Sequence, residues 1–86
     1  MRQATEIYSR EFDSIFFRLP VQVRERLESR IRHLDRNLER FPHQRLQGRP
    51  EFRLRVGDYR IIYTFDLGSN ELQLVTLGHR REIYRW

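Results

Sequence analysis

The spacing of the apolar residues changes partway along the chain, and this change constrains the fold more than any other feature. Between residues 12 and 38 the apolar side chains recur every three or four positions, as on one face of an amphipathic helix. Between residues 52 and 77 they mostly alternate with polar side chains, as in a strand with one buried face. We therefore expect a helical first half and a β-sheet in the second half.

The first half predicts a short strand and two helices. Residues 5–8 favour the strand, and Ser9 suits the N-cap of the first helix. Pro20 separates this helix from a longer one and suits its first turn; we expect Phe41-Pro42 to end the second helix. The two apolar stripes are Phe12, Ile15, Phe16 and Leu19, then Val23, Leu27, Ile31, Leu34 and Leu38.

The second half predicts three strands, at residues 52–56, 59–65 and 72–77, joined by turns at Gly57-Asp58 and Gly68-Ser69-Asn70. Residues 43–50 are expected to form a loop. The order β-α-α-β-β-β predicts an α+β fold, with a two-helix hairpin packed on one face of a mostly antiparallel four-stranded sheet. Residues 1–86 are expected to form a single domain, because a chain of this length builds one core.

All seventeen cationic side chains are arginines, and the formal net charge is +5. Alternation should point Arg53 and Arg55 away from the helices, and the next strand should place Arg60 beside them. Guanidinium groups match phosphate oxygens, so this free sheet face could bind a phosphodiester and stabilise charge developing on it. The alternative is that these arginines are solvated or paired with nearby carboxylates, from Glu51, Asp58 or Glu71.

A second cluster, His79-Arg80-Arg81, follows the last predicted strand, where loops often carry chemistry on a rigid scaffold. An imidazole with an ordinary pKa near ~6.5 can exchange a proton at neutral pH. Tyr84 and Trp86 could stack on a base or could pack the C-terminus into the core, and the sequence favours neither. His33 and His43 are expected at the surface or at a helix end, and we assign them no role.

Several classes of function are disfavoured by what the sequence lacks. There is no cysteine, no HExxH motif and no glycine-rich phosphate loop, so we expect neither a metal nor a cofactor. We find no signal peptide and no apolar run long enough to span a bilayer. We therefore expect a cytoplasmic protein that does not contact membranes.

Two segments carry a family resemblance. One joins Leu46-Gln47-Gly48 to Arg53-Leu54-Arg55-Val56-Gly57-Asp58-Tyr59-Arg60-Ile61-Ile62-Tyr63, and the other is Leu77-Gly78-His79-Arg80-Arg81-Glu82-Ile83-Tyr84. With the element order and the Leu-Pro pair before the second helix, the chain resembles the RelE branch of the RelE/ParE toxin superfamily over nearly its whole length. The resemblance implies a type II toxin that forms a hetero-oligomer with a cognate antitoxin protein. It also implies an mRNA interferase, an endoribonuclease that cleaves mRNA on the ribosome by metal-independent attack of the 2′-hydroxyl.

The resemblance also implies roles for single residues. Arg60 falls on the family's phosphate-contacting arginine and Arg80 on the arginine after the last strand, and we expect both to act in catalysis. Tyr84 falls on the C-terminal tyrosine that stacks on or orients the substrate. Substrate binding is expected of the remaining basic residues, Arg53, Arg55 and Arg81. Members of the family often carry lysine at the first two of these positions. Because a guanidinium stays protonated, arginine cannot replace lysine as a proton acceptor. His79 is therefore our first candidate for the general base, and Tyr84 the second.

Two other functions remain open at this point. A ParE-like toxin would share the fold and inhibit DNA gyrase without nuclease activity. A degenerate member would only bind its antitoxin. The arginine-bearing strand and the Gly-His-Arg segment favour the nuclease.

Overall fold

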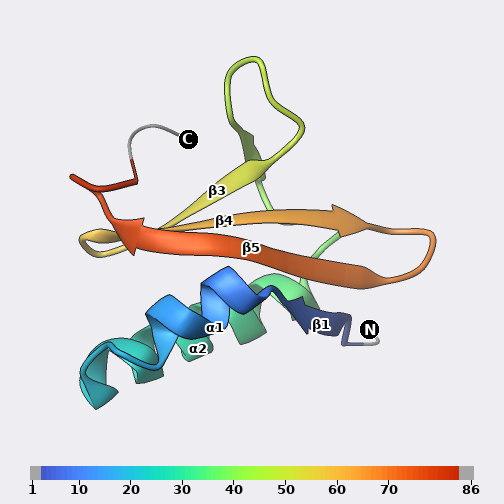
Figure 1. Ribbon diagram of the computed structural model, residues 1–86. Helices are drawn as coiled ribbons and strands as arrows, with labels where there is room; N and C mark the ends of the chain where they lie inside the picture. The colour runs from blue at the N-terminus through green and yellow to red at the C-terminus, as the bar shows by residue number, and fades with distance from the viewer. Residues whose placement is uncertain (1–2, 84–86) are drawn as a thin grey trace.

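A computed structural model describes residues 3–83 of the protein (Figure 1). The elements follow in the order β1 (Thr5–Tyr8), α1 (Arg10–Phe16), α2 (Val21–Arg36), β2 (Gln44–Arg45), β3 (Phe52–Val56), β4 (Tyr59–Asp66) and β5 (Glu71–His79). Within these residues no helix is long and apolar enough to cross a membrane.

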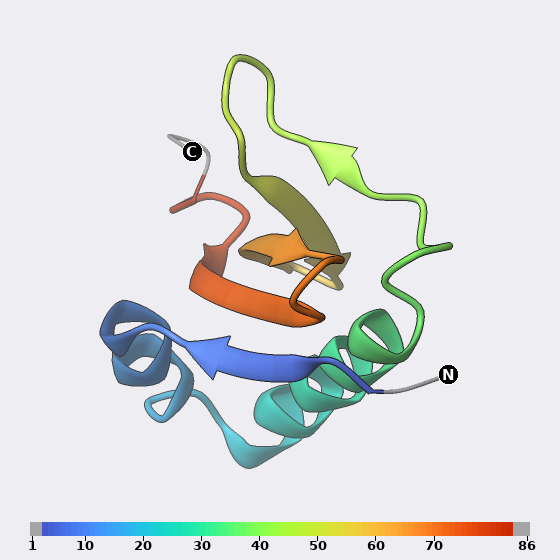
Figure 2. The same ribbon diagram turned by 90° about the vertical axis from the view of Figure 1, so that its right-hand side faces the viewer.

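The strands form one sheet in the order β1-β5-β4-β3-β2, in which β1 runs parallel to β5 and the other neighbours are antiparallel. Both helices cover the same face of this sheet, and Figure 2 shows the two layers from the side. The predicted α+β class and helix-on-sheet arrangement are confirmed. The sheet has five strands rather than four, because Gln44 and Arg45 pair with Arg53 and Phe52 at its edge. A strand of two residues is too short to produce a periodic pattern.

The start of α1 is fixed by Ser9, as predicted. The Ser9 hydroxyl accepts a hydrogen bond from the Phe12 amide at 2.9 Å, which caps the helix. The same hydroxyl donates to the carbonyl of Val75. Val75 is an extra residue in β5, where the pairing with β4 shifts between Ile62 and Tyr63. One side chain therefore ties the first helix to an irregular point of the last strand.

The second helix differs from the prediction at both ends. Pro20 is its N-cap rather than a residue of its first turn. The helix ends at Arg36, five residues before Phe41, and Asn37 has already left helical geometry. The Asn37 side chain donates to the His33 carbonyl at 2.7 Å, which satisfies a carbonyl left unpaired at the helix end.

The main core lies between the helices and the sheet. The two stripes supply buried or partly buried residues throughout, and the sheet contributes from its helix-facing side. The fully buried sheet residues of this core are Ile61, Tyr63, Leu72, Leu74 and Leu77. These positions confirm the predicted inward face of β4, and they leave Arg53, Arg55 and Arg60 on the opposite face.

The face opposite the helices is less open than predicted. Ile62 and Thr76 are partners across β4 and β5 on this face, and each is only 1% exposed. Leu46 is also buried outside the main core. The loop between β2 and β3 rises on this side of the sheet, as does the segment after β5 (Figure 1). The arginines therefore border a partly covered surface rather than an empty sheet.

His43 was expected at the surface or at a helix end, and this expectation is wrong. Its ring stacks on Phe65 at 4.1 Å, with the rings of Phe41 and Phe52 close by. Nε2 donates to the Leu38 carbonyl at 2.7 Å, so Nδ1 accepts from the Tyr63 hydroxyl at 2.6 Å. Burial raises the pKa of Tyr63. His43 thus links the chain after α2 to the centre of the sheet.

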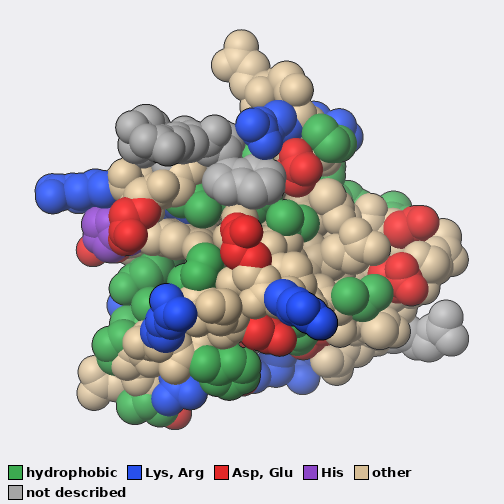
Figure 3. All heavy atoms as spheres, in the orientation of Figure 1, with side chains coloured by type: hydrophobic (Ala, Val, Ile, Leu, Met, Phe, Trp, Pro, Cys, Tyr) green, Lys and Arg blue, Asp and Glu red, His purple; other side chains and the backbone are tan. Residues whose placement is uncertain are grey.

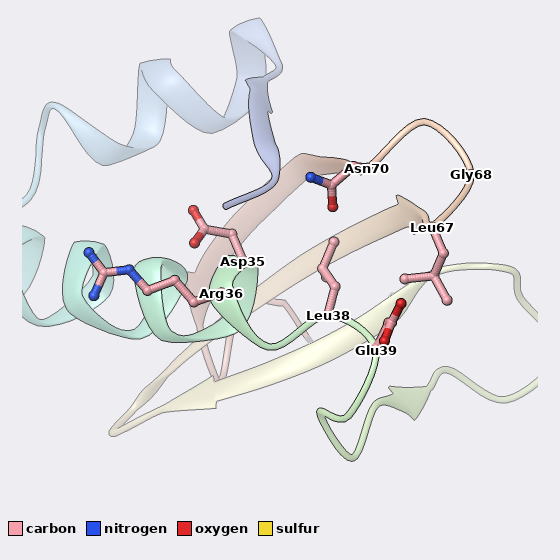
Figure 4. A pocket seen from close by; sticks show the side chains of 7 residues that line it. All are labelled: Asp35, Arg36, Leu38, Glu39, Leu67, Gly68 and Asn70. Carbon is pink, nitrogen blue, oxygen red and sulfur yellow. The ribbon is translucent and has the colours of Figure 1, made fainter. Parts of the chain in front are cut away.

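A buried carboxyl group joins β1 to α2. Asp35 is 1% exposed, and its Oδ2 accepts from Gln3 Nε2 at 3.4 Å, while Asp35 Oδ1 and Glu6 Oε2 are buried without a hydrogen-bond partner. Burial, and then the contact with Glu6, raise the pKa of Asp35 to about 7. Asp35 also lines a hollow of about 270 Å³ between the end of α2 and the β4–β5 turn (Figure 4).

Candidate phosphate-binding site

Four arginines gather where the β3–β4 hairpin turns and the chain leaves β5. Arg55 lies directly opposite Arg60, and Arg53 lies one pair further along the same face. Arg80 follows β5, and its backbone N–H donates to the Asp58 carbonyl at 2.7 Å. The hairpin turn therefore holds the segment after β5 beside the arginines of β3 and β4.

Arg60 is the most constrained member of this cluster. Its Nη1 donates to the carbonyls of Gly57 and Tyr59, each at 2.9 Å, so the side chain folds back onto the turn. Desolvation lowers the pKa of Arg60, and the positive charges of Arg55, Arg53 and Arg80 lower it further, while Asp58 opposes them. The positive charges thus act on one another, and a bound anion would relieve their repulsion.

The carboxylates near the cluster neutralise little of its charge. Asp58 Oδ1 lies 3.7 Å from Arg80 Nε, and these two side chains are 66% and 54% exposed. An ion pair this exposed is weak. Among residues 3–83, no carboxylate forms an ion pair with Arg53, Arg55 or Arg60, and Arg53 Nε is buried without a hydrogen-bond partner. The sequence suggested Asp58 as a partner for those three arginines, but its partner is Arg80.

The charge elsewhere on the molecule is distributed differently. In the view of Figure 3, basic and acidic side chains are interspersed over the helical layer rather than separated by sign. This agrees with the mixed charges of α2, where Glu28 and Arg32 lie one turn apart. The unbalanced arginines at the hairpin turn are thus a local feature and do not simply follow from the net charge of +5.

His79 does not join the arginine face. It is the cross-strand partner of Tyr59, and the two rings meet edge to face with centroids 5.7 Å apart. Tyr59 packs against the main core, so His79 lies on the helix side of the sheet. There it lines a hollow of about 480 Å³ together with Ile15 of α1 and Leu19, which follows that helix. Its Nδ1 accepts from the Arg81 amide at 3.3 Å.

Gly78, the residue before His79, faces the arginine side as the partner of Arg60. A Cβ atom at Gly78 would lie 3.3 Å from Ile83 Cδ1, so Ile83 packs closely over this position. Arg81 is exposed. Tyr84 and Trp86 lie outside the described residues, and the roles predicted for them stay predictions.

Comparison with known families decides the identity. The sequence matches the model of the ParE toxin of type II toxin–antitoxin systems over residues 2–84. The chain belongs to this toxin family, within the RelE/ParE superfamily. The predicted resemblance to the superfamily is therefore confirmed. No curated protein matches the sequence of this toxin.

Solved structures agree with this assignment at the level of the fold. The toxin is similar to a chain of the RelBE2 complex from Mycobacterium tuberculosis, with 20% identity, a TM-score of 0.77, and coverage of 93% of this chain and 94% of the other. A chain of the archaeal RelE–RelB complex from Pyrococcus horikoshii is 21% identical, with a TM-score of 0.76, and the match covers 92% of this chain and 97% of the other. A chain of the intact E. coli RelBE complex is 18% identical, with a TM-score of 0.75, and the match covers 88% of this chain and 95% of the other. The fold of the toxin is thus RelE-like.

The site of the toxin offers cationic donors rather than metal ligands. Among the residues that the structure describes, no group of three or more His, Cys, Asp or Glu side chains could hold a metal ion. What the cluster can do is bind a phosphate and stabilise additional negative charge on it, because the Arg60 guanidinium is already held in place by the turn.

Proposed function

We propose that this toxin is an mRNA endonuclease that acts on the ribosome, and hence in the cytoplasm. The supporting observation is the cluster of Arg53, Arg55, Arg60 and Arg80, in which partial desolvation and like charge lower the pKa of Arg60. Such a cluster favours a polyanion, and it favours most the state in which the phosphate carries extra negative charge.

The reaction we propose consumes no reactant other than the mRNA. The 2′-hydroxyl oxygen attacks the adjacent phosphorus, and the bond from that phosphorus to the 5′-oxygen of the next nucleotide breaks. The products carry a 2′,3′-cyclic phosphate and a 5′-hydroxyl group. Arg60 and Arg80 stabilise the charged transition state, while Arg53, Arg55 and Arg81 hold the flanking backbone.

The general base must take the proton of the 2′-hydroxyl group, and arginine cannot do so. His79 is the less favoured candidate in the folded toxin, because it faces Tyr59 on the helix side of the sheet. The other candidate, Tyr84, lies outside the described residues, and its role rests on the family resemblance. We therefore propose Tyr84 as the base, reversing the order expected from the sequence.

A cognate antitoxin is the partner that membership of a type II family implies, and several of the similar structures are complexes of a toxin with an antitoxin. We propose that the antitoxin of this chain presents an acidic segment to the arginine cluster. The reason is the charge of the cluster, which a carboxylate-rich segment would neutralise.

The family match itself favours a second candidate function, since the matched family is that of ParE toxins. A ParE-like toxin would inhibit DNA gyrase and leave mRNA intact. Primer extension on a translated mRNA after controlled expression distinguishes the two. Cleavage within the ribosomal A site supports the nuclease, whereas loss of plasmid supercoiling with intact mRNA supports the gyrase inhibitor. Absence of both effects would indicate a module that only binds its antitoxin.

A further inference from the structure

The turn between β3 and β4 contacts two arginines through different atoms. The carbonyls of Gly57 and Tyr59 accept from Arg60 Nη1, and the carbonyl between them, that of Asp58, accepts from the Arg80 backbone N–H. Three consecutive carbonyls thus fix the side chain of Arg60 and the backbone of Arg80. The Arg80 side chain is left to the Asp58 carboxylate.

The position of the Asp58 carboxylate relative to the Arg80 guanidinium affects which of its N–H groups can bind a phosphate. Asp58 Oδ1 lies 3.7 Å from Arg80 Nε. A carboxylate on the Nε side of a guanidinium can orient it by charge and leave both Nη groups for a second anion, and these groups match two oxygens of one phosphate. Among residues 3–83, Asp58 is also the one carboxylate among the charges that act on Arg60.

We propose that Asp58 is a positioning residue for Arg80. Its carboxylate orients the Arg80 guanidinium so that the two Nη groups face the phosphate that Arg60 binds. Asp58 does not touch the phosphate itself, because its charge would oppose binding. This inference rests on the proposed phosphodiester chemistry of the cluster.

The Asp58→Asn variant removes the charge and keeps the backbone contacts of the turn, since those are made by carbonyls. We expect kcat for mRNA cleavage to fall about fivefold, the effect of losing an exposed ion pair. KM should not rise, because the cluster gains one net positive charge. Asp58→Glu should restore kcat to within about twofold of the wild type. A rise in KM with unchanged kcat would overturn the inference.

A double-mutant cycle tests whether the effect passes through Arg80. Asp58→Asn should cause no further loss in an Arg80→Ala background, and should still cause about a fivefold loss in an Arg53→Ala background. Equal losses of kcat in both backgrounds would refute a positioning role of Asp58 for Arg80. Thermal unfolding of each variant identifies any loss that is due to misfolding.

A second measurement separates this inference from the nuclease proposal. A wild-type toxin that leaves mRNA intact would refute the nuclease, and the NMR signal of the Arg80 Nε–H group then decides the positioning. Faster solvent exchange of this proton in Asp58→Asn than in the wild type and Asp58→Glu supports it. Identical exchange in all three proteins overturns it.

Discussion

Replacing Arg60 with alanine should separate activity from folding. Arg60 lies opposite Arg55 in the β3–β4 hairpin, and directly opposed like charges destabilise a sheet by about 0.2–1 kcal/mol. The substitution removes this repulsion, but it also removes two hydrogen bonds to turn carbonyls, each contributing about 0.5–1.5 kcal/mol. Water can replace these bonds in part, because the turn is exposed. We expect a net loss of about 1 kcal/mol or less, or about 4–8 °C in Tm for a domain of this size.

The effect on the chemistry should be much larger. Loss of one preorganised donor to a developing anion typically costs a factor of about 10²–10³, or about 2.7–4 kcal/mol of transition-state stabilisation. Single-turnover cleavage of mRNA on programmed ribosomes measures this step, and growth inhibition at matched expression reports it in cells. Arg32→Ala is the matched control, because Arg32 is an exposed residue of α2 and the substitution removes the same charge.

Two results would refute this reasoning. If folded Arg60→Ala toxin cleaves mRNA at the rate of Arg32→Ala, then Arg60 does not act on the transition state. If Arg60→Ala is inactive only because its Tm has fallen far below that of the wild type, then the residue serves the fold and the proposed site loses its central member.

Further predictions concern the base, the buried carboxyl group and the antitoxin. Tyr84→Phe should slow single-turnover cleavage by about 10²–10⁴, the usual contribution of a general base, while His79→Gln should stay near the wild-type rate; the opposite ranking returns the role to His79. Because the pKa of Asp35 is raised to about 7 in the folded protein, its contribution to stability is fully present below its unfolded pKa and is lost as the pH rises through about 7. The free energy of unfolding, measured in urea between pH 4 and 8, should show this decline, and Asp35→Asn should abolish much of it. If the free energy of unfolding falls equally with pH in both proteins, Asp35 is not the group responsible. In complex with the antitoxin, hydrogen exchange should be protected at residues 53–60 and 80–83, and protection confined to the outer side of α2 would argue against direct blocking of the site.

The alternation of apolar residues sufficed to predict which arginines share a face, because Leu54 and Val56 could only be buried against the helices. The same rule explains why His79 lies apart from the arginine face. The predicted strand ended at Leu77, which left His79 free to turn toward Arg80, whereas β5 continues through His79 and alternation fixes its side chain on the helix side. Adjacency in sequence was therefore a poor guide to adjacency in space at this strand end.

Other features depend on contacts that carry no periodic signal. The packing of His43 requires Phe65 and Tyr63, which lie about twenty residues further along the chain, and nothing in the local sequence indicates this pairing. The early end of α2 depends on the Asn37 side chain and overrides an apolar pattern that continues to Leu38. The pairing of Asp58 with Arg80 likewise joins a turn to a distant segment.

The parallel pairing of β1 with β5 limits when this protein can fold during its synthesis. Thr5 pairs with Glu71 and Tyr8 with Leu74, so β1 lacks its β5 partner until β5 has also been synthesised. Arg80 cannot reach Asp58 before that same moment. A ribosome that translates this message must therefore release the segment after β5 before the arginine cluster can assemble.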